Sequence, residues 1–501
     1  MLSKFLVRGL GFFNDAYDLF VMNVVNVVLT EQYGADMYTP AMKSHVSAAA
    51  LVGAIVGQLV FGLLADRLGR RVTMITTCVI LIVGGILCTF AYGGSPAGTI
   101  WVLVVARGIL GLGIGGEYPL SASSSAEDAT SVANRNQRVA LTFSLQGLGS
   151  LAAAICSDVL VREFAPASRG KNDKQDLETI WRALFGIGVA PALVAVFFRY
   201  CAKEPETFLA AVRKHNKRKP SQDRDSTQRR RRRVSSCMQQ IQRILYHYGG
   251  RLFGTAATSF LFYIVFYAQN LFSATMLSVV GLDDPSLKEV TRQNVYVALL
   301  ALPGYYVAVA SINKIGRKRM QVQGFAAMTV IFLVLGAWWA DIQQHSTSFI
   351  VLYGLALFFA NFGPNTSTYI LPTEMFPTAI RGSCHGFSAA MGRLGAAIGS
   401  YGFSPLVTLP GYGYRGVFYT FAALCVLSIP ITLMFTFDNA DSLDAMDEEY
   451  EANILSSETL IDAARRQELD DEVSRTRKHT DKQDDDESNG EEVLLSSTSP
   501  A

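Results

Sequence analysis

Apolar residues occur along this chain in long runs that are separated by short polar intervals. A helix needs about 20 mostly apolar residues to cross a bilayer. Runs of about this length lie on both sides of a polar stretch at 202–250: 5–29, 44–65, 72–92, 99–120, 138–161 and 181–201, then 252–280, 293–312, 320–340, 348–371, 383–407 and 416–436. The pattern predicts an all-α membrane protein with twelve transmembrane helices in two pseudo-symmetric six-helix bundles.

The intervals between the runs differ in charge. Alternate intervals carry basic residues: Arg67, Arg70, Arg71, Arg135, Arg138, Lys314, Arg317, Lys318, Arg319 and Arg381. Two intervals on the other side, 93–98 and 341–347, carry no Lys or Arg. Because basic loops stay in the cytosol, we expect an integral, multi-pass protein with both termini cytosolic.

Composition agrees with a membrane protein. The 501 residues are 50% hydrophobic and 17% charged, whereas soluble chains carry roughly 25% charged residues. The seven cysteines show no paired or metal-like spacing, so we expect neither a disulfide framework nor a metal site. No cofactor motif occurs, and the first apolar run lacks the pattern of a cleavable signal peptide.

The charges outside the runs suggest the domain boundaries. We expect an N-terminal bundle at 1–201, a basic cytosolic linker at 202–250, a C-terminal bundle at 251–437 and an acidic, disordered cytosolic tail at 438–501. The linker holds five consecutive arginines, which we interpret as a contact for anionic lipid headgroups rather than for nucleic acid. Linker and tail could both serve trafficking or kinase partners.

The two halves contain an internal repeat with a constant offset of 247 residues, the separation of Asp66 from Asn313. The same offset pairs Glu127 with Glu374, Tyr118 with Asn365, and Gln146 with Arg393. Duplicated helical halves are typical of transporters, which bind their substrate between the halves near mid-membrane. The repeat therefore favours a carrier.

Two carboxylates lie inside the first apolar run. Asp15 is about 15 Å along the expected helix, too deep for a helix cap, and Asp18 shares its face at a spacing of three residues. A charge at that depth costs about 3 kcal/mol on insertion scales, and burial favours the neutral form of a carboxyl group. We expect at least one of the pair to carry a proton; the alternative, which suits Asp18 better, is a structural hydrogen bond. Glu117 in the fourth run is a further proton-coupling candidate.

A charged turn that occurs in both halves is a candidate gate. GLLADRLGRR places Asp66, Arg70 and Arg71 between the second and third runs, and VASINKIGRKR is its counterpart in the other half. A carboxylate in such a turn accepts hydrogen bonds from helix N-termini or arginines and can hold one side of a carrier shut. The alternative is a cluster that only sets topology. We assign the gating role to Asp66, Arg70, Arg71, Arg107, Glu127 and Glu374.

GLLADRLGRR and RGILGLGIGGEYP resemble the major facilitator superfamily over nearly the whole membrane portion. GFFNDAYDLFVMN, GIGGEYPLSAS and NFGPNTSTYILPTEMFPTAIRGSCHG, followed by SAAMGRLGA, resemble its phosphate:proton symporter family. The resemblance implies import of inorganic phosphate together with protons by alternating access, most simply across the plasma membrane. It implies no enzymatic activity and no nucleic-acid partner.

The resemblance also implies substrate-binding residues. Tyr118, Gln146 and Asn365 match the family's phosphate ligands, Tyr267 is retained, and Arg393 stands where the family often has Lys. Two further candidates are Asn361 and Tyr263, and the latter stands where the family has Asp, an acid used beside phosphate. For each polar residue the alternative is packing between helices. The change at Tyr263 predicts an altered pH dependence.

Other functions fit the same pattern. The first alternative is a carrier of an organophosphate, such as a glycerophosphodiester, or of another organic anion. The second is a phosphate sensor that binds its ligand but transports little. A membrane enzyme is disfavoured, because the chain has no nucleophile–base set, and ATP-driven transport is disfavoured because no G-x-x-x-x-G-K-[ST] motif occurs.

Overall fold

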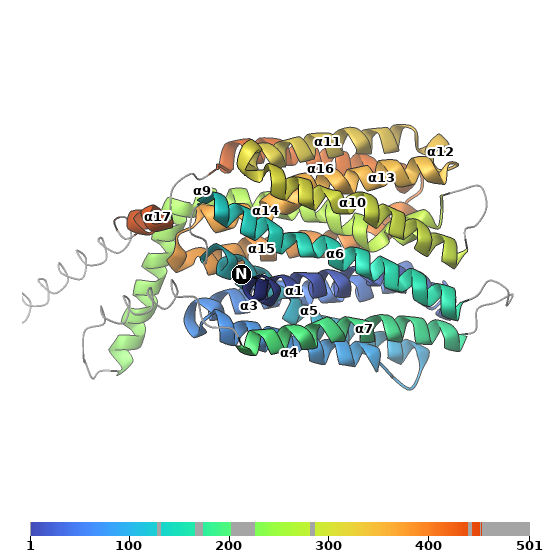
Figure 1. Ribbon diagram of the computed structural model, residues 1–501, viewed down its shortest axis with the longest axis horizontal. Coiled ribbons are helices and arrows are strands. Elements are labelled where there is room, and N and C mark those ends of the chain that lie inside the picture. Colours follow the sequence, from blue (N-terminus) through green and yellow to red (C-terminus); the bar gives the residue numbers. More distant parts are fainter. Residues whose placement is uncertain are drawn as a thin grey trace, which may run out of the picture. The chain divides into compact units, whose positions relative to one another are not determined.

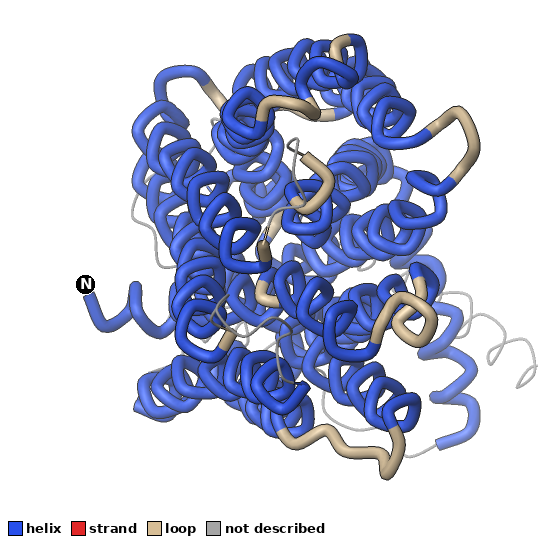
Figure 2. Tube along the Cα trace, turned by 90° about the vertical axis from the view of Figure 1, so that its right-hand side faces the viewer, coloured by secondary structure: helices blue, strands red, loops and turns tan. Residues whose placement is uncertain are grey.

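The computed structural model describes residues 2–127, 132–165, 174–201, 226–280, 286–438, 443–450 and 452, and these form helices joined by short loops, with no strand (Figure 2). The first half contains α1 (Leu2–Phe20), α2 (Met22–Tyr33), α3 (Pro40–Leu68), α4 (Arg70–Thr89), α5 (Pro96–Glu127), α6 (Val132–Phe164) and α7 (Lys174–Cys201). The second half contains α9 (Ser226–Leu277), α10 (Leu287–Ile315), α11 (Arg317–Ala337), α12 (Trp339–Ile342), α13 (Ser346–Ala360), the π-helical turn η1 (Asn361–Asn365), α14 (Thr366–Met375), α15 (Thr378–Thr408) and α16 (Gly413–Phe435); α17 (Leu443–Tyr450) follows.

Eleven of the twelve predicted membrane helices are confirmed in the part of the chain that the structure describes. Eleven spans are long and apolar enough to cross a membrane, and each coincides with a predicted run. The twelfth, α15, lies at the predicted run 383–407 but is less apolar, because Arg381, His385 and Arg393 interrupt it and all three are buried. A helix surrounded by other helices needs less apolar surface than one facing lipid.

Two spans are interrupted helices. The first consists of α1 and α2, which meet at Val21. The tenth consists of α13, η1 and α14, where Gly363 has non-helical backbone angles and Pro364 follows it. Such breaks in a membrane helix are tolerated where neighbouring groups satisfy the freed backbone. Both lie beside residues predicted to bind substrate or protons.

The membrane helices of both halves fall in one compact unit, Met1–Arg224 with His247–Leu443. A second unit comprises Asp225–Tyr246 and Asp444–Ala501. In it, residues 226–246 are the first part of α9, so the predicted linker 202–250 includes helix, and its residues 202–225 lie outside the described ones. The predicted tail 438–501 includes α17, and most of it also lies outside the described residues. The four domain boundaries remain predictions.

The long helices run side by side (Figure 1), and small residues let them approach closely. Within the first half α3 packs on α5, where a Cβ at Gly53 would overlap the carbonyl oxygen of Gly108. Between the halves α3 packs on α15, where Gly62 lies against Gly382 and Gly386. Because lipid gives no hydrophobic drive between membrane helices, such close backbone approach stabilises the bundle through packing. The other long contact between halves joins α6 to α10.

The repeat is visible in two tight turns. Gly69 ends α3 with φ of 97°, and Gly316 ends α10 with φ of 86°. Both angles are in the left-handed region that glycine adopts without strain. The two glycines are separated by the repeat offset, so the duplicated halves share this turn. We call the end of the bundle that holds Gly69 and Gly316 the basic end.

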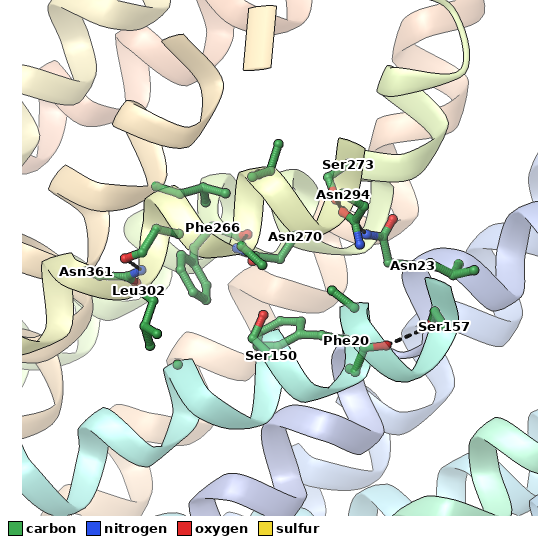
Figure 3. A pocket seen from close by; sticks show the side chains of 18 of the residues that line it. Phe20, Asn23, Ser150, Ser157, Phe266, Asn270, Ser273, Asn294, Leu302 and Asn361 are labelled. Atoms are coloured by element: carbon green, nitrogen blue, oxygen red, sulfur yellow. Dashed lines mark hydrogen bonds between the residues drawn. The ribbon is translucent and has the colours of Figure 1, made fainter. Parts of the chain in front are cut away.

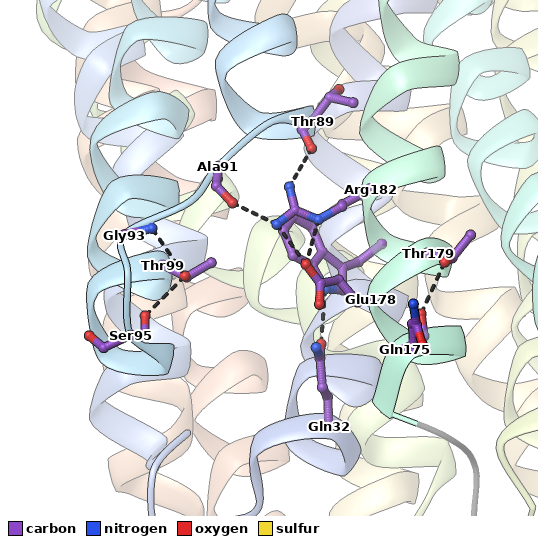
Figure 4. Close-up of polar contacts among 11 residues, drawn as sticks. Gln32, Thr89, Ala91, Gly93, Ser95, Thr99, Gln175, Glu178, Thr179 and Arg182 are labelled. Atoms are coloured by element: carbon purple, nitrogen blue, oxygen red, sulfur yellow. Dashed lines mark hydrogen bonds and ion pairs between the residues drawn. The ribbon is translucent and has the colours of Figure 1, made fainter.

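Polar contacts at the end opposite to the basic end hold helix ends of the first half together (Figure 4). Arg182 of α7 donates to the carbonyl oxygens of Thr89 and Ala91, both at 2.8 Å, and pairs with Glu178 at 2.7 Å. The indole of Trp181 donates to Gln32 at 2.9 Å. These bonds satisfy the carbonyls that end α4, which no helical partner can reach, and tie α4 and α2 to α7.

Candidate substrate and proton site between the halves

A buried arginine lies where the two halves meet. Arg393 of α15 is 2% exposed. Its guanidinium carbon is 5.0 Å from the ring centre of Tyr118 in the first half and 5.0 Å from that of Tyr267 in the second. It also donates a hydrogen bond to the hydroxyl of Tyr267. No carboxylate forms an ion pair with Arg393 among the described residues.

The local sequence explains how Arg393 reaches α9. Side chains at Gly392, Gly395 and Gly399 would overlap α9, the first at the ring of Tyr263 and the others at backbone carbonyls. The glycines on either side of the arginine therefore let α15 lie directly on α9. Without them the guanidinium would be held farther from Tyr267.

Two tyrosine hydroxyls join the halves at the same place. The hydroxyls of Tyr118 on α5 and Tyr263 on α9 are 3.0 Å apart, within hydrogen-bond distance. Tyr263 lies one turn before Tyr267, and their rings are 5.6 Å apart. The structure thus brings together four of the predicted substrate-binding residues, which present one cation and three hydroxyls.

Asp15 is buried without a hydrogen-bond partner. It is 3% exposed, and neither carboxyl oxygen has a partner among the described residues. Arg393 and Arg199 act on it electrostatically as opposite charges, and Glu117 and Asp18 act as like charges. An acid with this surrounding is rare inside a protein, because a buried polar group is nearly always hydrogen-bonded.

Glu117 is paired, in contrast to Asp15. Both of its oxygens contact Arg199 of α7 at 2.5 Å, and Thr77 of α4 donates to it at 2.8 Å. Sequence reasoning missed Arg199, because an arginine near the end of an apolar run is ordinarily a topology signal. Its position inside the run 181–201, followed by Tyr200 and Cys201, was the only indication of a buried role.

Asp18 and Arg107 lie inside the first half. Asp18 accepts a hydrogen bond from Asn14 at 2.8 Å and faces α7, where a Cβ at Gly188 would overlap it. Arg107 is fully buried and donates to the backbone oxygens of Val46 at 3.0 Å and of Asp18 at 3.3 Å. Both residues therefore join helices of one half, and neither lies against Arg393.

The asparagines of η1 form a chain with a tyrosine that sequence reasoning missed. Asn365 donates to Asn361 and to the hydroxyl of Tyr305, each at 2.9 Å, and Asn361 donates to the backbone oxygen of Ala301 at 3.1 Å. The irregular turn at Gly363 directs these amides toward α10. Gln146 of α6 is also buried, and its side-chain oxygen has no hydrogen-bond partner among the described residues.

A cavity extends from this region between α6, α9 and α10 (Figure 3). Asn361 and Tyr305 line one end of it, and Asn23, Ser273 and Asn294 line the other. Asn23 of α2 donates to Ser273 at 2.6 Å and to Asn294 at 3.0 Å, and it accepts from the backbone of Ala274 at 2.8 Å. One asparagine of the first half thereby contacts three groups of the second.

Aromatic side chains join the halves nearer the basic end. Tyr369 of α14 stacks on Phe143 of α6 with ring centres 4.6 Å apart. Phe12 and Tyr118 meet the same tyrosine edge-on at 5.1 and 5.2 Å. We call these four residues the aromatic cluster. Together with the Asn23 contacts, it leaves the halves in contact on both sides of Arg393.

Five of the six predicted gating residues belong to the basic end, whereas Arg107 lies inside the first half against Val46 and Asp18, away from that end. Glu374 pairs with Arg317 at 2.5 Å, and Arg317 lies 3.5 Å from Asp438. Arg71 donates to the backbone oxygen of Tyr200 at 2.5 Å. Asp66, Arg70 and Glu127 stand at helix ends, and their side chains are outside the described part. Their gating role remains a prediction.

Known proteins resemble the chain along most of its length. The profile of the sugar (and other) transporter family matches residues 5–450. Inorganic phosphate transporter 1-2 of Oryza sativa subsp. japonica is 34% identical over 508 residues, which cover 91% of this chain and 95% of the rice protein. Low affinity inorganic phosphate transporter 3 of Petunia hybrida is 32% identical over 498 residues, with coverage of 90% and 92%.

A solved structure shows the fold. The proton:xylose symporter XylE of the major facilitator superfamily, bound to 6-bromo-6-deoxy-D-glucose, matches with a TM-score of 0.70 at 20% identity, over 90% of this chain and 99% of that one. The predicted architecture and the predicted relationship are both confirmed. The chain belongs to the sugar (and other) transporter family of the major facilitator superfamily, beside plant members that are named inorganic phosphate transporters.

Proposed function

We propose that this chain is a secondary active transporter that imports inorganic phosphate with protons by alternating access. The names of its relatives supply the substrate. The single observation that supports it best is Arg393, a buried cation between the halves that bonds to the Tyr267 hydroxyl, lies against the ring of Tyr118 and forms no ion pair with a carboxylate of the described residues. A guanidinium with hydroxyl donors provides the charge and the hydrogen bonds that an oxyanion needs in a site shielded from water.

The anion would be held by both halves. Tyr118 and Gln146 belong to the first half, and Tyr263, Tyr267 and Arg393 to the second. Phosphate that displaces the bond between the hydroxyls of Tyr118 and Tyr263 would accept hydrogen bonds from each of them. Such a ligand stabilises the closed state, in which both sets of donors meet, more than either open state.

The proton would be carried by Asp15. Its unpartnered oxygens favour the neutral form while the site is closed. Burial of a neutral polar group without a hydrogen bond costs on the order of 2–7 kcal/mol, and burial of an unpaired charge costs more. Asp18, with its bond to Asn14 and its place inside the first half, fits a structural role better. Proton loss from Asp15 would follow opening toward the cytosol.

Contacts on both sides of the site support an alternating mechanism. The aromatic cluster joins the halves toward the basic end, and the Asn23 contacts join them toward the opposite end. Opening one side requires breaking only one set, so the site would be reached from one side at a time. The basic end would face the cytosol, with both termini there, and the plasma membrane is the membrane we propose.

Two segments would serve regulation rather than transport. The basic stretch 202–250 suits anionic lipid headgroups, and the acidic stretch 438–501 suits trafficking or kinase partners. Both are proposals from charge alone. Removal of 453–501 should leave transport by the purified protein unchanged and alter its amount or location in cells.

Radiolabelled phosphate uptake by proteoliposomes with an imposed proton gradient tests the function. We expect uptake that rises with an inward gradient, is slowed at low phosphate concentration in Arg393→Gln, and loses its dependence on the gradient in Asp15→Asn. Competition by unlabelled glycerophosphodiester that exceeds competition by phosphate would favour an organophosphate carrier. Phosphate binding without uptake would favour a sensor, and neither binding nor uptake would contradict the proposal.

A further inference from the structure

The ion pair between Glu117 and Arg199 saturates the carboxylate. Each oxygen of Glu117 accepts from a different nitrogen of Arg199 at 2.5 Å, and both side chains are 1% exposed. Thr77 donates to the same carboxylate at 2.8 Å, and Arg199 also donates to the backbone oxygen of Met74 at 3.1 Å. The pair therefore connects α5, α4 and α7 within the first half.

Helix α1 closes over this pair. A Cβ at Gly11 would overlap an oxygen of Glu117 and a nitrogen of Arg199. Gly11 and Asp15 are four residues apart, so they share one face of α1. The pair consequently lies beneath the same face from which Asp15 extends, one turn away.

Glu117 and Asp15 differ in the donors that their carboxyl groups contact. Glu117 accepts from two nitrogens of Arg199 and from the hydroxyl of Thr77, and bonds to a charged donor are the strong ones. Asp15 has no such donor, and the charged groups that act on it are Arg393, Arg199, Glu117 and Asp18; Cys78 is the other titratable group beside Arg199. Separating Arg199 from Glu117 would break a buried ion pair, which is strongly unfavourable.

We propose that Arg199 is a positioning residue for proton coupling: it holds both oxygens of Glu117 in an ion pair, so that Asp15 is the acid that gains and loses the proton. This inference rests on the proposed function and narrows the predicted proton-coupling set. When the site opens to the cytosol, the O–H bond of Asp15 breaks and its proton passes to a water molecule. The bonding electron pair stays on the carboxylate of Asp15 until phosphate leaves and a proton returns.

Four variants test the assignment: Arg199→Gln, Glu117→Gln, the double variant with both changes, and Asp15→Asn. Two transport readouts are needed, proton-gradient-driven phosphate uptake and phosphate exchange between equal internal and external concentrations. We expect Arg199→Gln alone to lose gradient-driven uptake, because an unpaired Glu117 then competes for the proton. The double variant should regain gradient-driven uptake, and Asp15→Asn should keep exchange and lose gradient-driven uptake in either background.

The opposite result for the double variant would overturn the proposal. If it retained exchange but lost gradient-driven uptake, Glu117 itself would carry the proton. Arg199→Lys supplies the conservative variant, and it should restore part of the gradient-driven uptake that Arg199→Gln loses. A purely structural arginine would instead lower exchange and gradient-driven uptake equally in each variant that replaces Arg199.

A measurement without phosphate separates this inference from the proposed function. The melting temperature of the purified protein, followed across pH, should change least between the double variant and the unaltered protein and most in the two single variants. Asp15→Asn should remove a pH-dependent step that the double variant keeps. If the unaltered protein failed to transport phosphate, the proposed function would be contradicted, while this melting comparison would still decide which acid exchanges the proton. A pH-dependent step lost in Glu117→Gln and kept in Asp15→Asn would refute the assignment.

Discussion

Arg393 donates a hydrogen bond to the hydroxyl of Tyr267 while its guanidinium lies 5.0 Å from the ring centre of that same residue. The ring of Tyr118, from the other half, lies at an equal 5.0 Å. The aromatic faces stabilise the buried cation without neutralising it, because a ring quadrupole attracts a cation but carries no net charge. The guanidinium thus keeps its full charge for an anion.

Replacing Arg393 should weaken phosphate binding. A hydrogen bond to a charged group contributes about 1.5–3 kcal/mol, so Arg393→Gln should raise the KM for phosphate about tenfold to a hundredfold. Arg393→Lys keeps the charge but loses the planar guanidinium, so its KM should lie between those of the unaltered protein and Arg393→Gln. Initial uptake rates over a range of phosphate concentrations measure the effect.

Arg292→Gln is the matched control, because this arginine is half-exposed on α10 and pairs with Glu289 at 3.3 Å. Its KM should match that of the unaltered protein. An equal KM for Arg393→Gln and Arg292→Gln would show that Arg393 does not bind the anion.

Tyr263 should set the pH dependence of uptake. Tyr263→Phe removes the bond to Tyr118 and should weaken phosphate binding by about 1 kcal/mol. Tyr263→Asp restores the acid that the family has there. Its carboxylate would repel phosphate when ionised, so uptake should decline more steeply as pH rises than in the unaltered protein. Identical pH profiles of uptake for Tyr263→Asp and the unaltered protein would contradict a position of Tyr263 beside the anion.

The fold followed from the sequence because the apolar runs have the length that a bilayer requires. The site followed in part, since polar groups such as Asp15, Tyr118 and Arg393 are costly at that depth and their presence needs a reason. The sequence did not predict the partner of Glu117. Arg199 stands where basic residues commonly mark topology, and only the packing of α1, through Gly11, makes it part of the site.

Asn23 illustrates a different limit. Asn23 and Asn26 lie on the same helix and both are buried, but side chains three residues apart point about 60° from one another. Asn23 therefore contacts the second half, whereas Asn26 bonds to Ser47 and Tyr38 of its own half at 2.9 and 2.8 Å. Periodicity alone does not show which face meets the other bundle.

Asn23→Ala should favour opening of the end opposite to the basic end. The change removes three hydrogen bonds between the halves, each contributing about 0.5–1.5 kcal/mol. A cysteine introduced at Ser157, which lines the cavity, should react faster with a water-soluble thiol reagent in this variant. Asn26→Ala is the control: it should lower the melting temperature without faster labelling. Equal labelling rates in both variants would show that the hydrogen bonds of Asn23 do not hold this end closed.

Asp438 should stabilise the start of α11. Its carboxylate accepts from the backbone nitrogens of Arg317 at 2.8 Å and of Lys318 at 2.9 Å, and it lies 3.5 Å from the Arg317 side chain. Loss of such a cap costs about 1 kcal/mol. Asp438→Ala should therefore lower the melting temperature, and Asp438→Asn, which keeps an acceptor but no charge, should lower it less. If both variants melted like the unaltered protein, this carboxylate would not hold the helix.

Gly53→Ala should destabilise the first half through a single methyl group. The added carbon would overlap backbone atoms of Gly108 and Leu112 on α5, and backbone in a packed helix cannot turn aside as a side chain can. Overpacking of this kind costs about 1–3 kcal/mol, so the purified variant should melt at a lower temperature and accumulate less. Gly249→Ala is the matched control, because nothing lies within 4 Å of its added carbon and alanine favours a helix by about 1 kcal/mol over glycine. The difference between the two variants isolates the contact from the change in helix propensity. A Gly53→Ala protein as stable as Gly249→Ala would mean that α3 and α5 are not held at backbone contact, and the close packing on which the placement of Glu117 and Tyr118 depends would have to be abandoned.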